Sequence, residues 1–225
     1  KDDNIFGSGN SFETIFTGNQ EDILFKISFI QYPVSSSNIK NSYSIFNDES
    51  DLSDSFGFKS DEFGFSYSIN FDYNEKTSIT TGLSYKTSDR HSAKKNISSV
   101  NDNIGKYNIY SLNSSITHDS TNDFLYPTDG VKNSLFFEYS PEKLSDDSYY
   151  KFIIKSDIYK KFKNSNRFVF LSNDIGYAES LEDKLSTINS FSLGGLNFKG
   201  FDYRGIGPKQ DNIYIGGNKF FTSTI

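Results

Sequence analysis

The stretch "EFGFSYSINFDYN" (62–74) alternates large apolar residues with small or polar ones. Its odd positions are Phe63, Phe65, Tyr67, Ile69, Phe71 and Tyr73, whereas the positions between them carry Gly, Ser, Asn and Asp. A period of two places successive side chains on opposite faces of a β-strand. The stretch therefore predicts one long strand with an apolar face and a polar face.

The same alternation recurs from end to end and predicts an all-β chain, an antiparallel meander of about ten long strands. Most of these strands exceed the 5–6 residues of an ordinary globular strand and match the roughly 9–11 residues of a tilted bilayer crossing. The strands are expected at about 10–17, 22–32, 39–48, 62–74, 77–88, 107–118, 130–140, 149–162, 167–179 and 213–225.

The links between these strands alternate in length. Short links are expected at 32–38, 74–77 and 162–167, and long polar links at 48–61, 89–106 and 180–212. Long links that all emerge on one side are typical of transmembrane β-barrels, whereas a soluble sandwich has no reason to sort them. Asn19–Glu21 and Asp119–Gly130 blur the pattern. The strand at 149–162 is heavily charged, so its ends are expected outside the hydrocarbon; the charges are Lys155, Asp157, Lys160 and Lys161.

Composition removes several classes of protein. A net charge of −6 argues against nucleic acid as the main partner, because phosphate binding needs a basic surface. The chain has no Cys, which removes disulfides and Cys-based metal sites. Its hydrophobic fraction is only 35%, but 17% of residues are aromatic, and disordered chains are poor in aromatics.

Short motifs that suggest chemistry have simpler interpretations. "GSGN" (Gly7–Asn10) and "GIGP" (Gly205–Pro208) precede strands, whereas a phosphate loop precedes a helix N-terminus. "THDS" (Thr117–Ser120) cannot converge as a hydrolase site, because neighbouring strand residues point to opposite faces. "DESDLSD" (Asp48–Asp54) lacks the Gly and Glu of a calcium loop and is interpreted as a solvated loop. We predict no enzymatic site, metal or cofactor.

The stretch "FSLGGLNFKGFDYRGIGP" (191–208) holds five of the chain's sixteen glycines. Aromatic and aliphatic residues are interleaved with them, which argues against a flexible linker. A connection this long is usually functional or disordered, and its apolar content disfavours disorder. Two interpretations stay open: a well-packed surface loop, or a loop folded back into the lumen of a barrel.

Four motifs resemble the BamA-type outer-membrane assembly barrels, also called bacterial surface antigens. Gly194-Gly195, Lys199-Gly200-Phe201 and Ile206-Gly207-Pro208 keep the order and spacing of the family's sixth outer loop. "YIGGNKFFTST", with Gly216, Gly217 and Asn218, resembles the strand that follows, and "NIFGSGNSF" resembles the first periplasmic turn. The family's Asp…Pro-Thr-x-Gly turn is matched in the segment that contains Asp119, Tyr126, Pro127, Thr128, Asp129 and Gly130.

The resemblance implies that residues 1–225 are part of a 16-stranded transmembrane β-barrel in the bacterial outer membrane, with 180–212 as its lumenal or extracellular loop. The first strand, the last four strands and the POTRA domains are expected to lie outside this chain. The implied function is folding and insertion of other outer-membrane proteins, without enzymatic chemistry or cofactor. The alternatives are a polypeptide-translocating pore of the same superfamily (two-partner secretion, or the translocation and assembly module) and a passive porin.

Implied partners are outer-membrane lipids, unfolded outer-membrane protein clients, accessory assembly lipoproteins and periplasmic chaperones, with no nucleic acid.

One departure from the family concerns the loop. The family has an arginine where this chain has Lys199, and lysine lacks the planar fork of arginine. The resemblance therefore predicts a lumenal latch at Lys199, and the substitution puts its strength in question.

Overall fold

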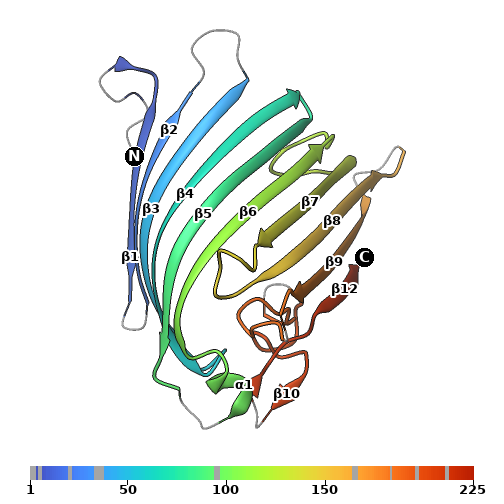
Figure 1. Ribbon diagram of the computed structural model, residues 1–225. Coiled ribbons are helices and arrows are strands. Elements are labelled where there is room, and N and C mark those ends of the chain that lie inside the picture. Colours follow the sequence, from blue (N-terminus) through green and yellow to red (C-terminus); the bar gives the residue numbers. More distant parts are fainter. Residues whose placement is uncertain are drawn as a thin grey trace.

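The computed structural model of the chain is built around one curled antiparallel sheet (Figure 1). It describes residues 4, 7–19, 22–32, 38–93, 97–163, 167–182, 184–195, 198–210 and 213–225. Within these residues ten strands pair in chain order from β1 to β9, and β12 closes the series beside β9. The predicted ten-stranded meander is confirmed.

The elements have the following bounds. The first half of the sheet is β1 (Ser11–Gly18), β2 (Asp22–Gln31), β3 (Ile39–Leu52), β4 (Phe58–Asn74) and β5 (Thr77–His91). The second half is β6 (Gly105–Asp119), β7 (Gly130–Ser140), β8 (Tyr149–Lys161), β9 (Phe168–Ser180) and β12 (Lys219–Thr224). The one-turn helix α1 (Ser98–Asn101) precedes β6, and β10 (Lys209–Gln210) and β11 (Ile213–Tyr214) form a small separate ladder. No helix in the described part of the chain is long and apolar enough to cross a membrane.

The long polar link expected at 48–61 is wrong. Strands β3 and β4 continue through it, and only 53–57 turn between them. The acidic motif Asp48–Asp54 therefore lies mostly within β3. One of its carboxylates forms an ion pair with the neighbouring strand, since Lys59 Nζ of β4 lies 2.8 Å from Asp51 Oδ2 of β3. Polar pairs between the two strands extend the hairpin through residues whose sequence shows no alternation of apolar and polar side chains.

The strand expected at 213–225 is also corrected. Regular pairing with β9 begins only at Lys219, because Gly217 instead forms an isolated bridge with Phe191. The long link at 89–106 is present, but it contains α1, whose Val100 is fully buried. The short links at 32–38 and 162–167, the link Asn19–Glu21 and the N-terminal "NIFGSGNSF" lie partly outside the described residues.

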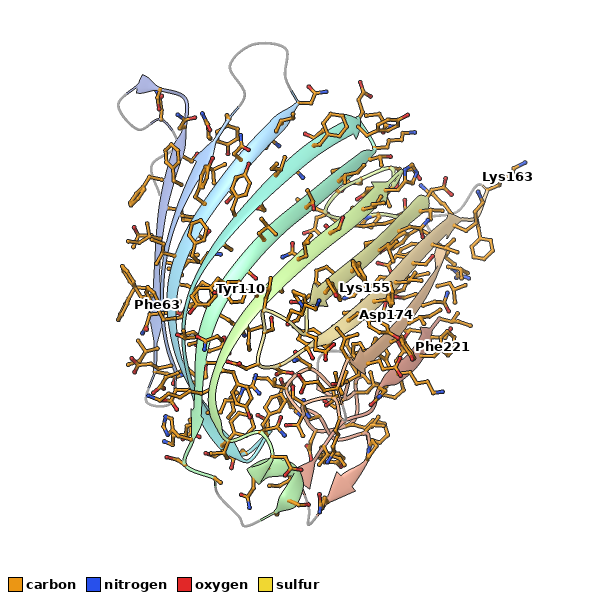
Figure 2. All side chains as sticks on the ribbon, viewed as in Figure 1. Phe63, Tyr110, Lys155, Lys163, Asp174 and Phe221 are labelled. Carbon is orange, nitrogen blue, oxygen red and sulfur yellow. The ribbon has the colours of Figure 1, made fainter. Side chains whose placement is uncertain are left out.

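The convex face of the sheet carries the predicted apolar stripe. Phe63, Phe65 and Leu83 are 55%, 44% and 56% exposed in this chain, and Figure 2 shows Phe63 on the outer side. The ten steps from Phe63 to Tyr73 on β4 rise about 34 Å, or about 25 Å along the membrane normal at the roughly 40–45° tilt of barrel strands. That is the height of the apolar band on a transmembrane barrel.

The concave face is polar and built from small side chains. Five serines stand directly opposite one another across β2 to β6: Ser28, Ser44, Ser66, Ser84 and Ser111. The hydroxyls of Ser84 and Ser111 lie 2.6 Å apart, and those of Ser28 and Ser44 2.9 Å. Two of the β8 charges that seemed to oppose a membrane strand, Lys155 and Asp157, lie on this face too. Lys160 instead shares the convex face with Ile158 near the end of the strand, where it pairs with Asp129 at 3.3 Å. Lys155 stands opposite Asp174, as Figure 2 shows, and Asp157 accepts a hydrogen bond from Ser172 (2.6 Å).

Phe136 and Phe137, adjacent on β7, test which face meets lipid. Phe137 stands opposite Phe152 on the convex face, whereas Phe136 stands opposite Ile153 on the concave face. In the full-length protein in vesicles, Phe137→Lys is expected to lower the free energy of unfolding by about 2–4 kcal/mol, as for a lysine in the hydrocarbon. Phe136→Lys is expected to cost clearly less in the same urea titration. Equal losses would contradict a lipid-facing convex face.

Candidate functional site

The segment 181–218, called here the anchored loop, folds from the end of β9 back over the concave face. Leu185 is buried with Tyr149 and Ala178 in one apolar cluster. Ile213 is buried in a second cluster with Phe56, Phe58, Ile97 and Val100, against which Ile188 also packs. Of the two interpretations left open by the sequence, the structure has the loop packed against the sheet's inner side.

The anchored loop is a narrow hairpin in its middle part. Phe191 and Gly217 exchange two backbone hydrogen bonds of 2.8 and 2.7 Å, and Leu193 and Ile206 exchange two of 3.1 and 2.9 Å. Gly194 has φ 129° and lies against the returning chain, where an added Cβ would be 2.0 Å from the Asp202 carbonyl oxygen. The Gly-Gly motif therefore allows the two limbs of the loop to approach closely.

Lys199, the predicted latch residue, is exposed at the tip of the loop together with Gly200. Phe201 is 52% exposed and its ring lies 5.7 Å from that of Phe198. Gly194, Gly195 and Ile206 lie in the paired middle of the hairpin, whereas Gly207 and Pro208 are exposed, and the Pro208 carbonyl accepts a 3.0 Å hydrogen bond from Ile215. In this chain the predicted latch motif is thus divided between an exposed tip, a paired middle and an exposed Gly207–Pro208 segment.

The buried cation of the loop is Arg204. It is 6% exposed and lies with its guanidinium carbon 3.8 Å from the centre of the Phe56 ring, in the turn between β3 and β4. One guanidinium nitrogen donates a 3.1 Å hydrogen bond to the Tyr214 carbonyl. Burial lowers the pKa of Arg204 from its usual range. Its φ of 55° is an uncommon backbone conformation for a non-glycine residue, so the surrounding contacts hold it there.

A second anchor is the carboxylate of Asp147, in the link 141–148 between β7 and β8. Its Oδ2 accepts hydrogen bonds from Arg90 Nη2 (3.0 Å), Ser186 Oγ (2.9 Å) and Asn189 Nδ2 (3.2 Å). The Arg90 side chain is 1% exposed and that of Asp147 9%. The Arg90 guanidinium also lies 4.3 Å from the centre of the Tyr107 ring. One carboxylate thus joins β5, a loop of the barrel end and the anchored loop.

The two flanking motifs have structural roles. Gly216, Gly217 and Asn218 join β11 to β12, and the Asn218 carbonyl accepts a 2.7 Å hydrogen bond from Ala178 of β9. In the turn motif, Asp119 bonds to Thr121 and pairs with Lys132 at 3.0 Å. Gly130 has φ 110°, and an added Cβ would be 2.4 Å from the Ser120 carbonyl oxygen.

The outer part of that turn is held by side chains. Asn122 accepts hydrogen bonds from the backbone of Thr128 and of Asp129, each 2.9 Å long. Backbone N–H groups of Tyr126 and Leu125 lower the pKa of Asp123. Phe124, Leu125 and Tyr126 are strongly exposed, and Pro127 completes the turn.

The histidine and the aspartate of the "THDS" motif contact different partners. His118 bonds to Thr77 (3.0 Å), and Asp119, the next residue, is engaged by Thr121 and Lys132 instead. No group of acidic residues and histidines among the described residues is arranged to hold a metal ion. What the site can do is hold a long loop against a barrel wall by charge, hydrogen bonds and aromatic contacts.

Sequence reasoning missed Arg90, Asp147 and Arg204 as anchors. Arg90 and Asp147 are separated by 57 residues, and neither lies in a motif. The one signal for Arg204 was its place in the glycine-rich loop, close to the motif position that Lys199 occupies.

The chain resembles known proteins both in sequence and in fold. A family model described as the Omp85 superfamily domain matches residues 4–225. The crystal structure of BamA from Haemophilus ducreyi lacking POTRA domains 1–3 superposes with a TM-score of 0.87 at 18% sequence identity. The match covers 99% of this chain and 48% of that one, so the chain spans about half the length of the structure it resembles. At this identity the likeness concerns the fold.

Arg204 and Lys199 can be compared directly as latch residues. Arg204→Asn keeps a residue that tolerates positive φ but removes the contact with Phe56, worth about 2 kcal/mol when desolvated. In the full-length protein the amides of Gly205 and Ile206 are then expected to exchange with solvent deuterium roughly 30-fold faster. Lys199→Asn, the matched control, is expected to leave these rates unchanged. The reverse order of effects would make Lys199 the latch.

The buried and exposed ion pairs of β5 provide a second test. Asp147→Asn leaves Arg90 charged and unpaired, and breaking a buried pair in this way costs about 3–5 kcal/mol. Asp89→Asn breaks the exposed Lys106–Asp89 pair (3.3 Å), where about 1 kcal/mol or less is expected. Urea denaturation of the full-length protein measures both. Similar losses for the two variants would show that Asp147 anchors nothing.

Proposed function

The chain belongs to the Omp85 superfamily and is part of an outer-membrane β-barrel, and from that premise we propose that its protein folds and inserts other outer-membrane β-barrels. The observation that carries the proposal is the anchored loop packed on the concave face of a sheet that superposes on a BamA barrel. The clients of such a factor are unfolded outer-membrane proteins.

The physical task of an assembly factor explains what this part of the chain contributes. A strand entering hydrocarbon must have its backbone groups paired, because each unpaired group costs several kcal/mol there. A barrel that offers a strand edge and disturbs the lipid beside it lowers that barrier without a cofactor. The remainder of the wall must then stay closed, and the continuous ladders from β1 to β9 and from β9 to β12 supply that rigid wall.

The anchored loop supports the same proposal. Arg90 and Asp147 hold its beginning and Arg204 holds the limb that returns from its tip, so the loop connects the β3–β4 turn, β5 and the β7–β8 link. A connection between strands that far apart braces the wall while another part of the barrel opens. The exposed tip, with Lys199 and Phe201, is the surface through which the loop would contact the rest of the barrel.

Accelerated folding of a client is the direct test. The full-length protein is reconstituted in vesicles, and a urea-unfolded outer-membrane client is added by dilution. Folding, measured as the shift in gel mobility of the unheated client, is expected to be at least about tenfold faster than in empty vesicles, about 1.4 kcal/mol of barrier. Vesicles with a passive porin are the matched control.

The other functions considered predict different outcomes in the same vesicles. A translocating pore delivers the client to the vesicle interior, where added protease cannot reach it and no folded barrel forms. A passive channel conducts ions and leaves the folding rate at that of the porin control. Either result would overturn the assembly proposal.

A further inference from the structure

A groove of about 260 Å³ opens on the convex face at the end of the barrel where the anchored loop lies. It is bounded on one side by β5 and β6 and on the other by the end of β7 and the link 141–148. Its lining includes Leu83, Tyr85, Tyr110, Leu112, Tyr139 and Leu144. Ser84 and Ser111 also border it, but their hydroxyls bond to each other on the concave face.

The groove exists because β7 is shorter than β6. The ladder between them ends at the pair Leu112–Tyr139, so the first half of β6 has no strand on that side. In the link 141–148, side chains bond to the backbone of β6 in place of a neighbouring strand. Ser145 Oγ accepts from the Tyr110 N–H and donates to the Tyr110 carbonyl, both at 2.9 Å, and Asp146 accepts from the Asn108 N–H at 2.7 Å. The backbone groups of Tyr110 and Asn108 are therefore paired although no strand lies beside them, because the Asp146 N–H also donates to the Asn108 carbonyl at 2.9 Å.

The outer wall of the gap is apolar and open. Leu144 is 61% exposed, beside a turn in which Pro141 accepts hydrogen bonds from the Leu144 and Ser145 N–H groups. Leu112, on the opposite side, is 47% exposed. Both belong to the convex apolar band that faces lipid in an outer-membrane barrel, so the groove is continuous with the membrane interior.

These contacts indicate which kind of molecule the groove can bind. An added β-strand needs free backbone donors and acceptors, and those of Tyr110 and Asn108 are already used. The polar groups on the convex side of the lining are tyrosine hydroxyls, and that of Tyr85 already donates to Asn108 Oδ1 at 3.1 Å, so the groove offers little to a polar ligand. The volume lies below the roughly 300–1,000 Å³ of a drug-sized pocket, which suits one unbranched hydrocarbon chain. Because the bilayer is as apolar as the groove, selectivity comes from packing against the flanking rings, Tyr85 and Tyr110, whose centroids are 4.6 Å apart.

The convex face of β6 also shows where a headgroup would lie. Outward from Leu112 it presents Tyr110, then Asn108, then Lys106, which is 85% exposed. Lys143 is exposed next to Leu144 on the opposite rim. The change from leucine through tyrosine to lysine is that of a membrane interface.

We propose that this groove is a binding site for one acyl chain of a membrane lipid, whose headgroup lies at the level of Lys106 and Lys143. The link that bounds the groove also carries Asp147, but the proposal does not depend on the proposed assembly function. It would hold a lipid more firmly than the rest of the convex surface.

Photo-crosslinking tests the site in the full-length protein. A benzophenone side chain is placed at position 144 or, as a control, at position 152, a convex position on β8 outside the groove. Both are expected to give lipid adducts in the native membrane. After extraction and washing in detergent, the adduct at 144 is expected to persist and that at 152 to be lost. Leu83→Trp, which fills the groove, is expected to abolish the retained adduct at 144.

The unheated mobility of each variant on a gel confirms that it is folded, and Leu112→Trp replaces Leu83→Trp if the latter fails this check. Mass spectrometry identifies the adduct at 144. A polypeptide adduct there would mean that the groove docks a protein, and equal loss at 144 and 152 would mean ordinary boundary lipid. Either outcome overturns the proposal.

Discussion

The pairing of backbone groups between neighbouring strands is the constraint on which this structure depends. In hydrocarbon no water replaces a missing hydrogen bond, so each membrane strand must be paired along its whole length. The sheet meets this condition by an uninterrupted antiparallel series from β1 to β9 and by β12 beside β9. Where β7 is too short for β6, Ser145 and Asp146 supply the missing partners from side chains. Backbone groups of β6 are thus paired even where no strand lies beside it.

Given that ladder, the alternation of side chains separates two environments. The convex face takes most of the aromatic and aliphatic residues, and the concave face takes serines, glycines and the β8 charges Lys155 and Asp157. Small residues on the concave face leave space for a loop, while the serine hydroxyls bond to one another across strands. Charges that look unfavourable in a membrane strand, such as Lys155, are accommodated because they stand beside Asp174 on the inner side.

The anchored loop combines apolar packing with two buried arginines that act in different ways. Arg90 is paired with a carboxylate that two loop side chains also contact, so the charge organises a network. Arg204 has no such carboxylate among the residues that the structure describes; it contacts the Phe56 ring and one carbonyl instead. Both limbs of the loop are therefore fixed to parts of the barrel that are distant in sequence, whereas its tip, with Lys199, is left exposed.

The sequence by itself determined the strands, their order and their two faces. The information for these is local, since a period of two is visible within any dozen residues and short links force neighbours to pair. The ends of β3 and β4, the late start of β12 and the residues that anchor the loop were decided by tertiary structure. Arg90 and Asp147 meet across 57 positions, and Asp147 and Asn189 across 42. The motif drew attention to Lys199, but packing against Phe56 placed Arg204 inside instead. No periodicity records such contacts, because they depend on how the sheet curls and on which side chain reaches the wall first.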